Sequence, residues 1–467
     1  MKFKRFLALL MAFSMVAAAC GDSDDAASSG DDSGSGTTGS DAEEGGGSSD
    51  GGEPTEVATD YGVTDDTIRV GLLADLSGIF APLVVEVVEA YEVYIEMLNE
   101  QGGIGGREVE MVVLDQAYDV PRHIEQYEKL RQESDEGVVF IGHSSGSPHT
   151  AAIAADLVAD DLLAHPFTWY SGWADPDFGT NAAELYTTYC LEAHNSVSYM
   201  HDKLTEEGIE PKLAVISFPG EYGQDGATGA KMAAEALGIE IVYDGEGQVV
   251  PGADQTPVIS ELVNAQPTLV FASINPTALT EIFGGARSQG LDAQWTGSWP
   301  TFNFQLLGTD LAADLDEYYF PSAFTATWGA DVEGMDTVVE EMSARRPDLP
   351  TSDHYILGWT QAALTHQLLE FANERGDLTR AGVVEAFNDP GFSVDFGGLA
   401  PQQTWAGDPN EYLVRESYMY EIDASQFDLA PLSEGGGSTG LVLLEGPFVS
   451  EAAEDYVWDG PCFAPQG

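Results

Sequence analysis

The stretch TIRVGLLA, Thr67–Ala74, decides the fold, because it opens a regular alternation of strands and helices. It is rich in β-branched residues and leucine, which favours a strand. Apolar residues at helical spacing follow over 83–99, and the glycines of QGGIGGR, 101–107, end that helix. The same order continues with a strand at 108–114, a helix at 121–132 and a strand at 137–141. This alternation predicts a parallel sheet with helices on both faces.

The alternation starts again after a predicted helix at 183–205. Strands are expected at 213–217, 239–243, 268–272 and 294–297, with helices at 226–237, 256–265 and 277–288. A strand at 318–322 precedes helices at 335–345, 354–374 and 380–387. From about Gly407 the chain is rich in glycine and proline, and a strand at 417–422 is expected within a C-terminal wrap. Two successive alternations predict an α/β protein with two doubly wound parallel-sheet lobes.

The first residues, 1–19, are typical of an export signal. A basic start, MKFKR, precedes a mostly apolar run over 6–19 that is too short to span a bilayer. The run ends in AAACG, which resembles the lipobox of bacterial lipoproteins, although Ala17 stands where leucine is usual. We therefore expect Cys20 to carry a lipid that anchors the protein to the outer face of the cytoplasmic membrane. The alternative is an ordinary cleaved signal that happens to contain Cys20.

Residues 20–66 are expected to form a linker between this anchor and the globular part. Up to about Val57 the chain consists mainly of glycine, serine, threonine and acidic residues. Such a composition buries too little apolar surface to offset the entropy of ordering. No lysine or arginine occurs between Arg5 and Arg69, so the acidic side chains repel one another and extend the linker.

The charge of the chain excludes several classes of partner. It has 79 acidic and 17 basic residues, a formal net charge of −62. This charge argues against nucleic-acid binding and against docking on anionic lipid through basic patches. We expect a solvated acidic surface around a globular part of about 400 residues, a length that suits two domains.

Three cysteines in an exported protein leave one without a partner. If Cys20 takes the lipid, Cys190 and Cys462 can form a disulfide in an oxidising compartment. The alternative is two unpaired buried thiols. The histidines are scattered and the sequence has no nucleotide-binding fingerprint, so neither a metal site nor a cofactor is expected.

Several short motifs occur in the order and at the spacing of a known family. They are IRVG at 68–71, LSG at 76–78, GGIGG at 102–106, IGHSS at 141–145, EYG at 221–223, ARSQGL at 286–291 and FGGL at 396–399. Over residues 68–423 the chain resembles the branched-chain amino-acid-binding, type I periplasmic binding proteins of ABC importers. No single motif decides this resemblance, which rests on their order and spacing together.

The resemblance implies a clamp of two lobes that holds a small molecule by closing a hinge. The chain would cross between the lobes near residues 187, 321 and 408. The first lobe would then contain 67–187 and 322–408, and the second lobe 188–321 and 409–467. We expect a monomer that delivers its ligand to the permease subunits of an ABC importer. A ligand-binding sensor subunit of a signalling system would have the same clamp, and the sequence does not separate the two.

The resemblance also implies where the ligand binds. The loop after the third strand would hold a carboxylate with backbone amides and a hydroxyl at the start of a helix. The first-lobe candidates are Ser77, Phe80 with its neighbour Leu83, Ser145, Gly146, Ser147, Thr168, Trp169, Tyr170 and, from the returning segment, Tyr355. From the second lobe, Tyr222 would close over the ligand. Phe80 and Tyr355 could equally be core residues.

One departure from the family bears on the ligand. Amino-acid binders of this family usually hold the ammonium with an acidic residue of the second lobe, and Trp299 stands at that position here. Ile274 or Asn275 replaces another aromatic residue of the family. A tryptophan cannot neutralise a buried ammonium as a carboxylate does. We therefore expect a compact carboxylate or amide with an apolar or aromatic body rather than a standard amino acid.

The segment GHSSG, 142–146, also fits the G-x-S-x-G elbow of α/β-hydrolases, between a predicted strand and a predicted helix. Ser144 would then be the nucleophile of an esterase. No downstream histidine follows a terminal strand in the order that this chemistry needs. We therefore expect a binding protein rather than an enzyme.

Overall fold

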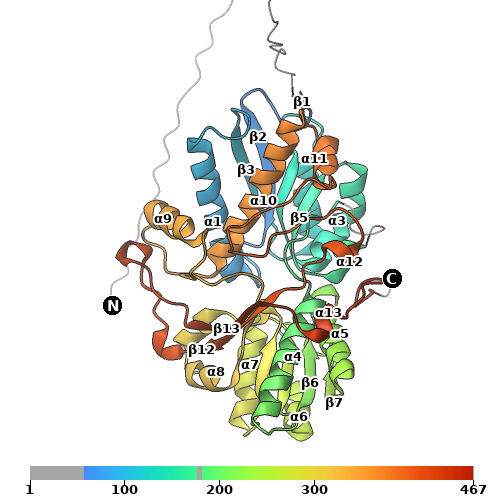
Figure 1. Cartoon of the computed structure of the whole chain (residues 1–467), viewed down its shortest axis with the longest axis vertical. Helices are drawn as coiled ribbons and strands as arrows, with labels where there is room; N and C mark the ends of the chain where they lie inside the picture. Colours follow the sequence, from blue (N-terminus) through green and yellow to red (C-terminus); the bar gives the residue numbers. More distant parts are fainter. Residues whose placement is uncertain (1–56, 176–180, 466–467) are drawn as a thin grey trace, which may run out of the picture. The chain divides into compact units, whose positions relative to one another are not determined.

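The computed structural model describes residues 57–175 and 181–465 (Figure 1). The predicted signal peptide, Cys20 and positions 20–56 of the predicted linker lie outside the described residues. Within the described part, no helix is both long and apolar enough to cross a membrane. Two four-stranded parallel sheets and a three-stranded antiparallel sheet contain most of the strands.

The first lobe is built on a parallel sheet with the strand order β3-β2-β4-β5. Its strands are β2 (Thr67–Ala74), β3 (Glu108–Asp115), β4 (Phe140–Ser145) and β5 (Leu163–Phe167). The helices that connect them are α1 (Ala81–Glu100), α2 (Val120–Leu130) and α3 (Ser147–Ala159). The strand β2 is largely buried because α1 and α2 contact it, which explains its nearly continuous apolar sequence.

Helices from a distant part of the chain complete this lobe. They are α10 (His354–Glu374) and α11 (Arg380–Phe387). The helix α10 packs along α1, where the hydroxyl of Tyr94 lies 2.9 Å from Nδ1 of His366 (Figure 1). Gly358 permits the close approach, since a Cβ there would lie 2.0 Å from the carbonyl oxygen of Val87. The first lobe therefore consists of two segments, separated in the sequence by the second sheet.

The second lobe repeats the arrangement with the strand order β7-β6-β8-β9. Its strands are β6 (Lys212–Ser217), β7 (Glu240–Gly245), β8 (Leu269–Ser273) and β9 (Gln294–Gly297). Its helices are α4 (Tyr189–Glu206), α5 (Glu221–Leu237), α6 (Thr256–Ala265) and α7 (Pro276–Ser288). In each sheet the first strand lies between the second and the third. The loops that follow the first and the third strands therefore leave to opposite sides of the sheet, which opens a crevice at their carboxyl ends.

Smaller elements surround the two sheets. The antiparallel sheet has the order β10-β12-β13, and a short parallel pair joins β1 to β11. The strands are β1 (Ala58–Thr59), β10 (Ser322–Ala323), β11 (Asp377–Leu378), β12 (Ser417–Ile422) and β13 (Leu441–Phe448). The short helices are α8 (Ala312–Tyr318), α9 (Met335–Arg345), α12 (Pro409–Tyr412) and α13 (Glu451–Glu454). The fold is α/β, with two parallel-sheet lobes, as the sequence predicts.

The expected strand at 318–322 is largely wrong. Tyr318 is the last residue of α8, and Tyr319 makes only an isolated parallel bridge to Trp295. Regular pairing starts at β10, against β12. The aromatic run is explained by burial rather than by a strand, because Tyr319 and Trp295 are almost fully buried.

Two other bounds differ because of buried polar groups. The strand expected at 137–141 is β4, which starts at Phe140 and continues through Ser145. The polar residues at its end suggested a loop. They are buried in the strand instead, because Nδ1 of His143 lies 2.8 Å from Oε1 of Gln361 in α10. The helix expected at 183–205 starts only at Tyr189, where the side chain of Thr188 caps it by accepting the Leu191 amide.

A disulfide joins Cys190, in α4, to Cys462, with the two Cα atoms 6.3 Å apart. The tail around Cys462 contacts the segment that follows β5. The amide of Cys462 donates to Oγ of Ser171 at 2.8 Å, and the hydroxyl of Tyr170 donates to the carbonyl of Phe463 at 2.7 Å. Ser171 in turn donates to the buried carboxylate of Asp225, in α5, at 2.6 Å. The tail therefore connects a first-lobe segment to two second-lobe helices.

Candidate functional site

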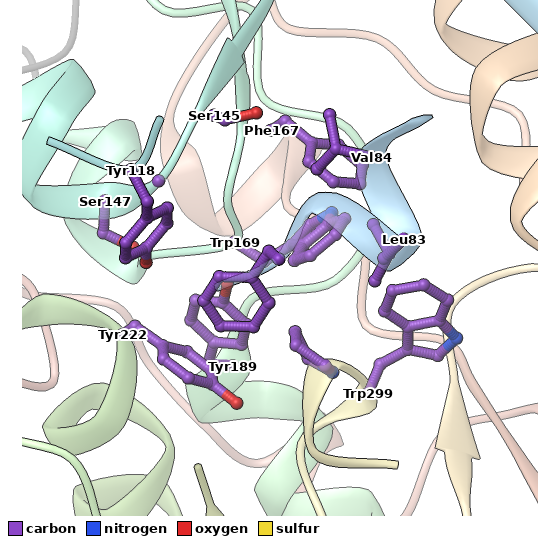
Figure 2. Close-up of a pocket in the computed structure, with 13 residues that line it drawn as sticks. Leu83, Val84, Tyr118, Ser145, Ser147, Phe167, Trp169, Tyr189, Tyr222 and Trp299 are labelled. Carbon is purple, nitrogen blue, oxygen red and sulfur yellow. The ribbon is translucent and has the colours of Figure 1, made fainter. Parts of the chain in front are cut away.

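A cavity lies between the two lobes, at the carboxyl ends of their strands (Figure 2). We call it the cleft cavity. Its lining consists of Phe80, Leu83, Val84, Tyr118, Ser145, Gly146, Ser147, Phe167, Trp169, Tyr189, Tyr222, Trp299 and Pro300. Aromatic and aliphatic side chains form most of the wall, and the polar groups gather at the loop between β4 and α3.

The start of α3 forms the polar side of the cleft cavity. Gly146 precedes the helix with a φ of 93°, in the left-handed region that glycine tolerates best. The first amides of a helix have no acceptor within it, and the helix dipole favours an anion there. The hydroxyl of Ser147 is hydrogen-bonded to that of Thr168, while Oγ of Ser145 lies 2.6 Å from Nε2 of His143. Pro148 has no amide hydrogen, and the Gly146 amide donates to the carbonyl of Phe167. The loop can therefore bind a carboxylate through the amides of Ser147 and His149.

Aromatic rings from both lobes form the apolar wall. Trp169 packs against Tyr189 and Trp299, with ring centroids 5.7 and 5.9 Å away. Tyr222, at the start of α5, has its ring centroid 6.2 Å from that of Phe80 in the opposite lobe. Its hydroxyl donates to the carbonyl of Ile274 at 2.6 Å, which fixes the ring in place. The Phe80–Tyr222 contact thus spans the cleft.

Comparison with known proteins identifies the family. A model described as "Periplasmic binding protein" matches residues 67–426 of the chain. The chain belongs to the periplasmic binding protein family.

Relatives of this periplasmic binding protein include the leucine-, isoleucine-, valine-, threonine- and alanine-binding protein of Pseudomonas aeruginosa, at 26% identity over 55% of this chain. Leu/Ile/Val-binding protein homolog 3 of Brucella melitensis is 26% identical over 48% of the chain. The matches span 66% and 55% of the length of these two relatives.

Solved structures have the same fold. A fatty acid ABC transporter substrate-binding protein from Thermomonospora curvata superimposes with a TM-score of 0.75 at 28% identity, covering 86% of this chain and 97% of that one. A branched-chain amino acid ABC transporter protein from Thermus thermophilus with bound valine gives a TM-score of 0.68 at 18% identity, with coverages of 84% and 98%. These neighbours have the type I periplasmic binding protein fold.

Several predicted site residues of this periplasmic binding protein line the cleft cavity. They are Phe80, Ser145, Gly146, Ser147, Trp169, Tyr222 and Trp299, and the expected wall residue Leu83 joins them. The loop at 145–147, Trp169 and Tyr222, which the resemblance implies, therefore line one cavity with Trp299.

Four predicted residues lie outside the lining, for different reasons. The hydroxyl of Ser77 donates to Asp115 at 2.8 Å near the surface. Thr168 supports Ser147 from behind, and Tyr170 bonds the C-terminal tail. Tyr355 is a core residue, because its ring is fully buried and its hydroxyl donates to the carbonyl of Pro350. Of the two alternatives for Tyr355, the structure therefore agrees with the core residue.

Five lining residues were not among the predicted site residues. They are Val84, Tyr118, Phe167, Tyr189 and Pro300. Phe167 lies beside the predicted Thr168, and Tyr189 begins the first helix after the predicted crossing near 187, so position alone could have suggested both. Tyr118 has a φ of 52°, and its ring lies 4.9 Å from that of Phe80. No pattern in the sequence indicates that backbone conformation.

The Trp299 backbone is fixed by a buried acid. Its amide donates to Oε1 of Glu192 at 2.9 Å, and the hydroxyl of Ser322 donates to the same oxygen. Glu192 is fully buried, and burial raises its pKa well above the ordinary value, although the two hydrogen bonds oppose the shift. Glu192 does not line the cleft cavity, so it is placed to hold Trp299 rather than to face a ligand.

The free energy of unfolding of Glu192→Gln, relative to that of the wild type, should increase as the pH rises. The folded state keeps a proton on Glu192 that the unfolded chain releases above a pKa of about 4.3, so wild-type stability falls with pH by up to about 1.4 kcal/mol per unit. Glutamine cannot ionise, and its Oε1 can still accept both bonds. Urea denaturation of both proteins at about pH 5 and about pH 8 measures the difference. An equal difference at both pH values would contradict the buried, protonated acid.

The esterase alternative is wrong. The family and the structural neighbours are substrate-binding proteins rather than enzymes. Ser144 is fully buried, and its hydroxyl lies 2.7 Å from that of Thr150 and 3.3 Å from Nε2 of His123, away from the cleft cavity. Burial lowers the pKa of His123 to about 3, so this histidine is a poor base. The motif belongs to the end of a buried strand.

Among the described residues, no group of three or more histidine, cysteine, aspartate and glutamate side chains could hold a metal ion.

Proposed function

We propose that this periplasmic binding protein captures a small carboxylate with an apolar body outside the cytoplasm and delivers it to the permease of an ABC importer. The make-up of the cleft cavity carries the proposal. The start of α3 would bind the carboxylate through the amides of Ser147 and His149. The rings of Trp169, Tyr189 and Tyr222 would enclose the apolar body.

The same cavity supports a ligand without an α-ammonium. Among the described residues that line it, none is acidic. A buried ammonium without a carboxylate partner would lose several kcal/mol of solvation. The partial charges on the ring faces would recover only about 0.5–2 kcal/mol of that loss. A carboxylic acid therefore suits this lining better than an amino acid.

The ligands in the names of the similar proteins include both fatty acids and amino acids. The Thermomonospora protein, named for fatty acids, is the more similar of the two structures described above, at 28% identity. The Pseudomonas and Thermus proteins are named for amino acids, at 26% and 18% identity. The lipid anchor at Cys20, the permease partner and the monomeric state stay predictions from the sequence.

A matched panel of ligands tests the proposal. Leucine, isoleucine and valine are each compared with the acid that lacks the amino group, namely 4-methylpentanoate, 3-methylpentanoate and 3-methylbutanoate. Hexanoate, octanoate and phenylacetate extend the panel, and 4-methylpentanamide tests whether an amide replaces the carboxylate. Each acid at a hundred times its Kd should stabilise the folded protein by about 2.7 kcal/mol, seen as a raised Tm.

Calorimetric titration then ranks the affinities. We expect each acid to bind at least about tenfold more tightly than its amino acid, a difference of about 1.4 kcal/mol. Small-angle scattering should show a smaller radius of gyration when an acid is bound, because the hinge closes. Tight binding of leucine, with none of 4-methylpentanoate, would reject the ligand class and leave the family assignment intact.

A further inference from the structure

A second, small space adjoins the cleft cavity at Trp299. Its apolar walls include Phe302 and Phe304, from the segment after β9, Ala323 and Ala326, next to the predicted crossing near 321, and Leu441 of β13. Its polar lining consists of Ser322, Thr325, Thr327, Asp353 and His354. Trp299 is the one described residue that lines both spaces. We call this space the hinge chamber.

The indole of Trp299 stands between the two spaces. Its ring centroid lies 5.9 Å from that of Trp169, in the wall of the cleft cavity, and 5.6 Å from that of His354, in the wall of the hinge chamber. Glu192 accepts the backbone amide of Trp299, which holds the backbone from which the indole extends. The indole is thus a wall that the cleft cavity and the hinge chamber share.

The polar loop and Trp299 lie at opposite sides of the cleft cavity (Figure 2). A ligand whose carboxylate meets the start of α3, near Ser147, would direct its apolar body across Trp169 toward the indole. A longer body would meet the indole before it reached the hinge chamber.

We propose that Trp299 sets the maximum length of the ligand's apolar body by closing the cleft cavity against the hinge chamber. The inference rests on the carboxylate ligand proposed above. It makes Trp299 a specificity-determining residue, because removal of the indole would join the two spaces into one longer pocket.

Straight-chain carboxylates from butanoate to dodecanoate, titrated by calorimetry into the full chain, test this inference. In the wild type, affinity should rise about fourfold with each methylene until the chain reaches the indole, and then stop rising or fall. In Trp299→Ala, the rise should continue for at least two further methylenes, while the shortest acids bind more weakly. Trp299→Phe, which keeps a smaller ring, should give an intermediate maximum length.

Two further variants separate the partition from a general loosening of the protein. Trp328→Ala removes a half-buried tryptophan that lines neither space, so the maximum length should stay at the wild-type value. The double variant Trp299→Ala/Ala326→Leu refills the hinge chamber and should move the maximum back toward the wild type. Thermal melting confirms that each variant is folded.

The outcomes distinguish the two proposals. If wild-type protein binds carboxylates but the maximum length is the same in Trp299→Ala and Trp299→Phe, the partition is overturned and the ligand class stands. An equal shift in Trp328→Ala would overturn it as well. If wild-type protein binds no carboxylate of any length, the proposed function itself has failed.

Discussion

Replacing Gly146 with alanine should weaken carboxylate binding by about a hundredfold. Gly146 has a φ of 93°, and a Cβ there would lie 2.4 Å from Nδ1 of His149 and 2.9 Å from the ring of Tyr118. The loop must shift to remove these contacts, which moves the amides at the start of α3. Hydrogen bonds to a charged group contribute about 1.5–3 kcal/mol each, so the loss of one or two accounts for this factor. Calorimetric titration with the best acid of the panel measures it.

Gly220→Ala is the matched control for this prediction. Gly220 precedes α5 as Gly146 precedes α3, with a φ of 89°, but a Cβ there would meet nothing within 4 Å. The backbone strain is similar in both variants, and only Gly146→Ala adds a clash at the polar loop. We expect Gly220→Ala to change the affinity by less than about threefold. If both variants lost the same factor in affinity, the cause would be backbone strain. That result would contradict a carboxylate-binding loop at Gly146.

Removing the disulfide should lower the free energy of unfolding by about 2–5 kcal/mol. The bond joins positions that are 272 residues apart, and it holds the tail against Ser171 and Asp225. The disulfide lowers the conformational entropy of the unfolded chain, and the double variant Cys190→Ser/Cys462→Ser lacks this effect. Urea denaturation compares the double variant with the wild type.

Reductant supplies the control for the disulfide. It should destabilise the wild type to about the level of the double variant and leave the double variant unchanged. Equal denaturation midpoints for all four samples would show that the bond contributes nothing to stability.

Much of the fold could be predicted because a continuous apolar run indicates a buried strand and helical spacing of apolar residues indicates a helix. The apolar strand β2 and the amphipathic helix α9 have the predicted bounds. Prediction failed where tertiary contacts decide. His143 and Ser145 extend β4 because Gln361, far along the chain, supplies a partner for the imidazole. A local reading of the sequence contains no information about that partner.

The site could be predicted in part, for a related reason. Gly146 and Trp299 could be placed by the resemblance to the family, because both positions follow the end of a strand that the sequence predicts. Tyr355 was misplaced because an aromatic residue has the same appearance in a core and in a pocket. Tyr118 was missed because its contribution depends on a left-handed backbone conformation in a loop.

The two-segment first lobe has a consequence for the order in which the chain folds. The helix α1 precedes the second sheet in the sequence, yet its partner α10 follows that sheet. Until α10 is available, the apolar face of α1, with Val87, Tyr91 and Tyr94, has no cover and can associate with other chains. The second sheet is formed by one continuous stretch of the chain. Its contacts therefore join residues that are closer in the sequence than those of α1 and α10. We therefore expect the second sheet to form first and α10 to complete the first lobe afterwards.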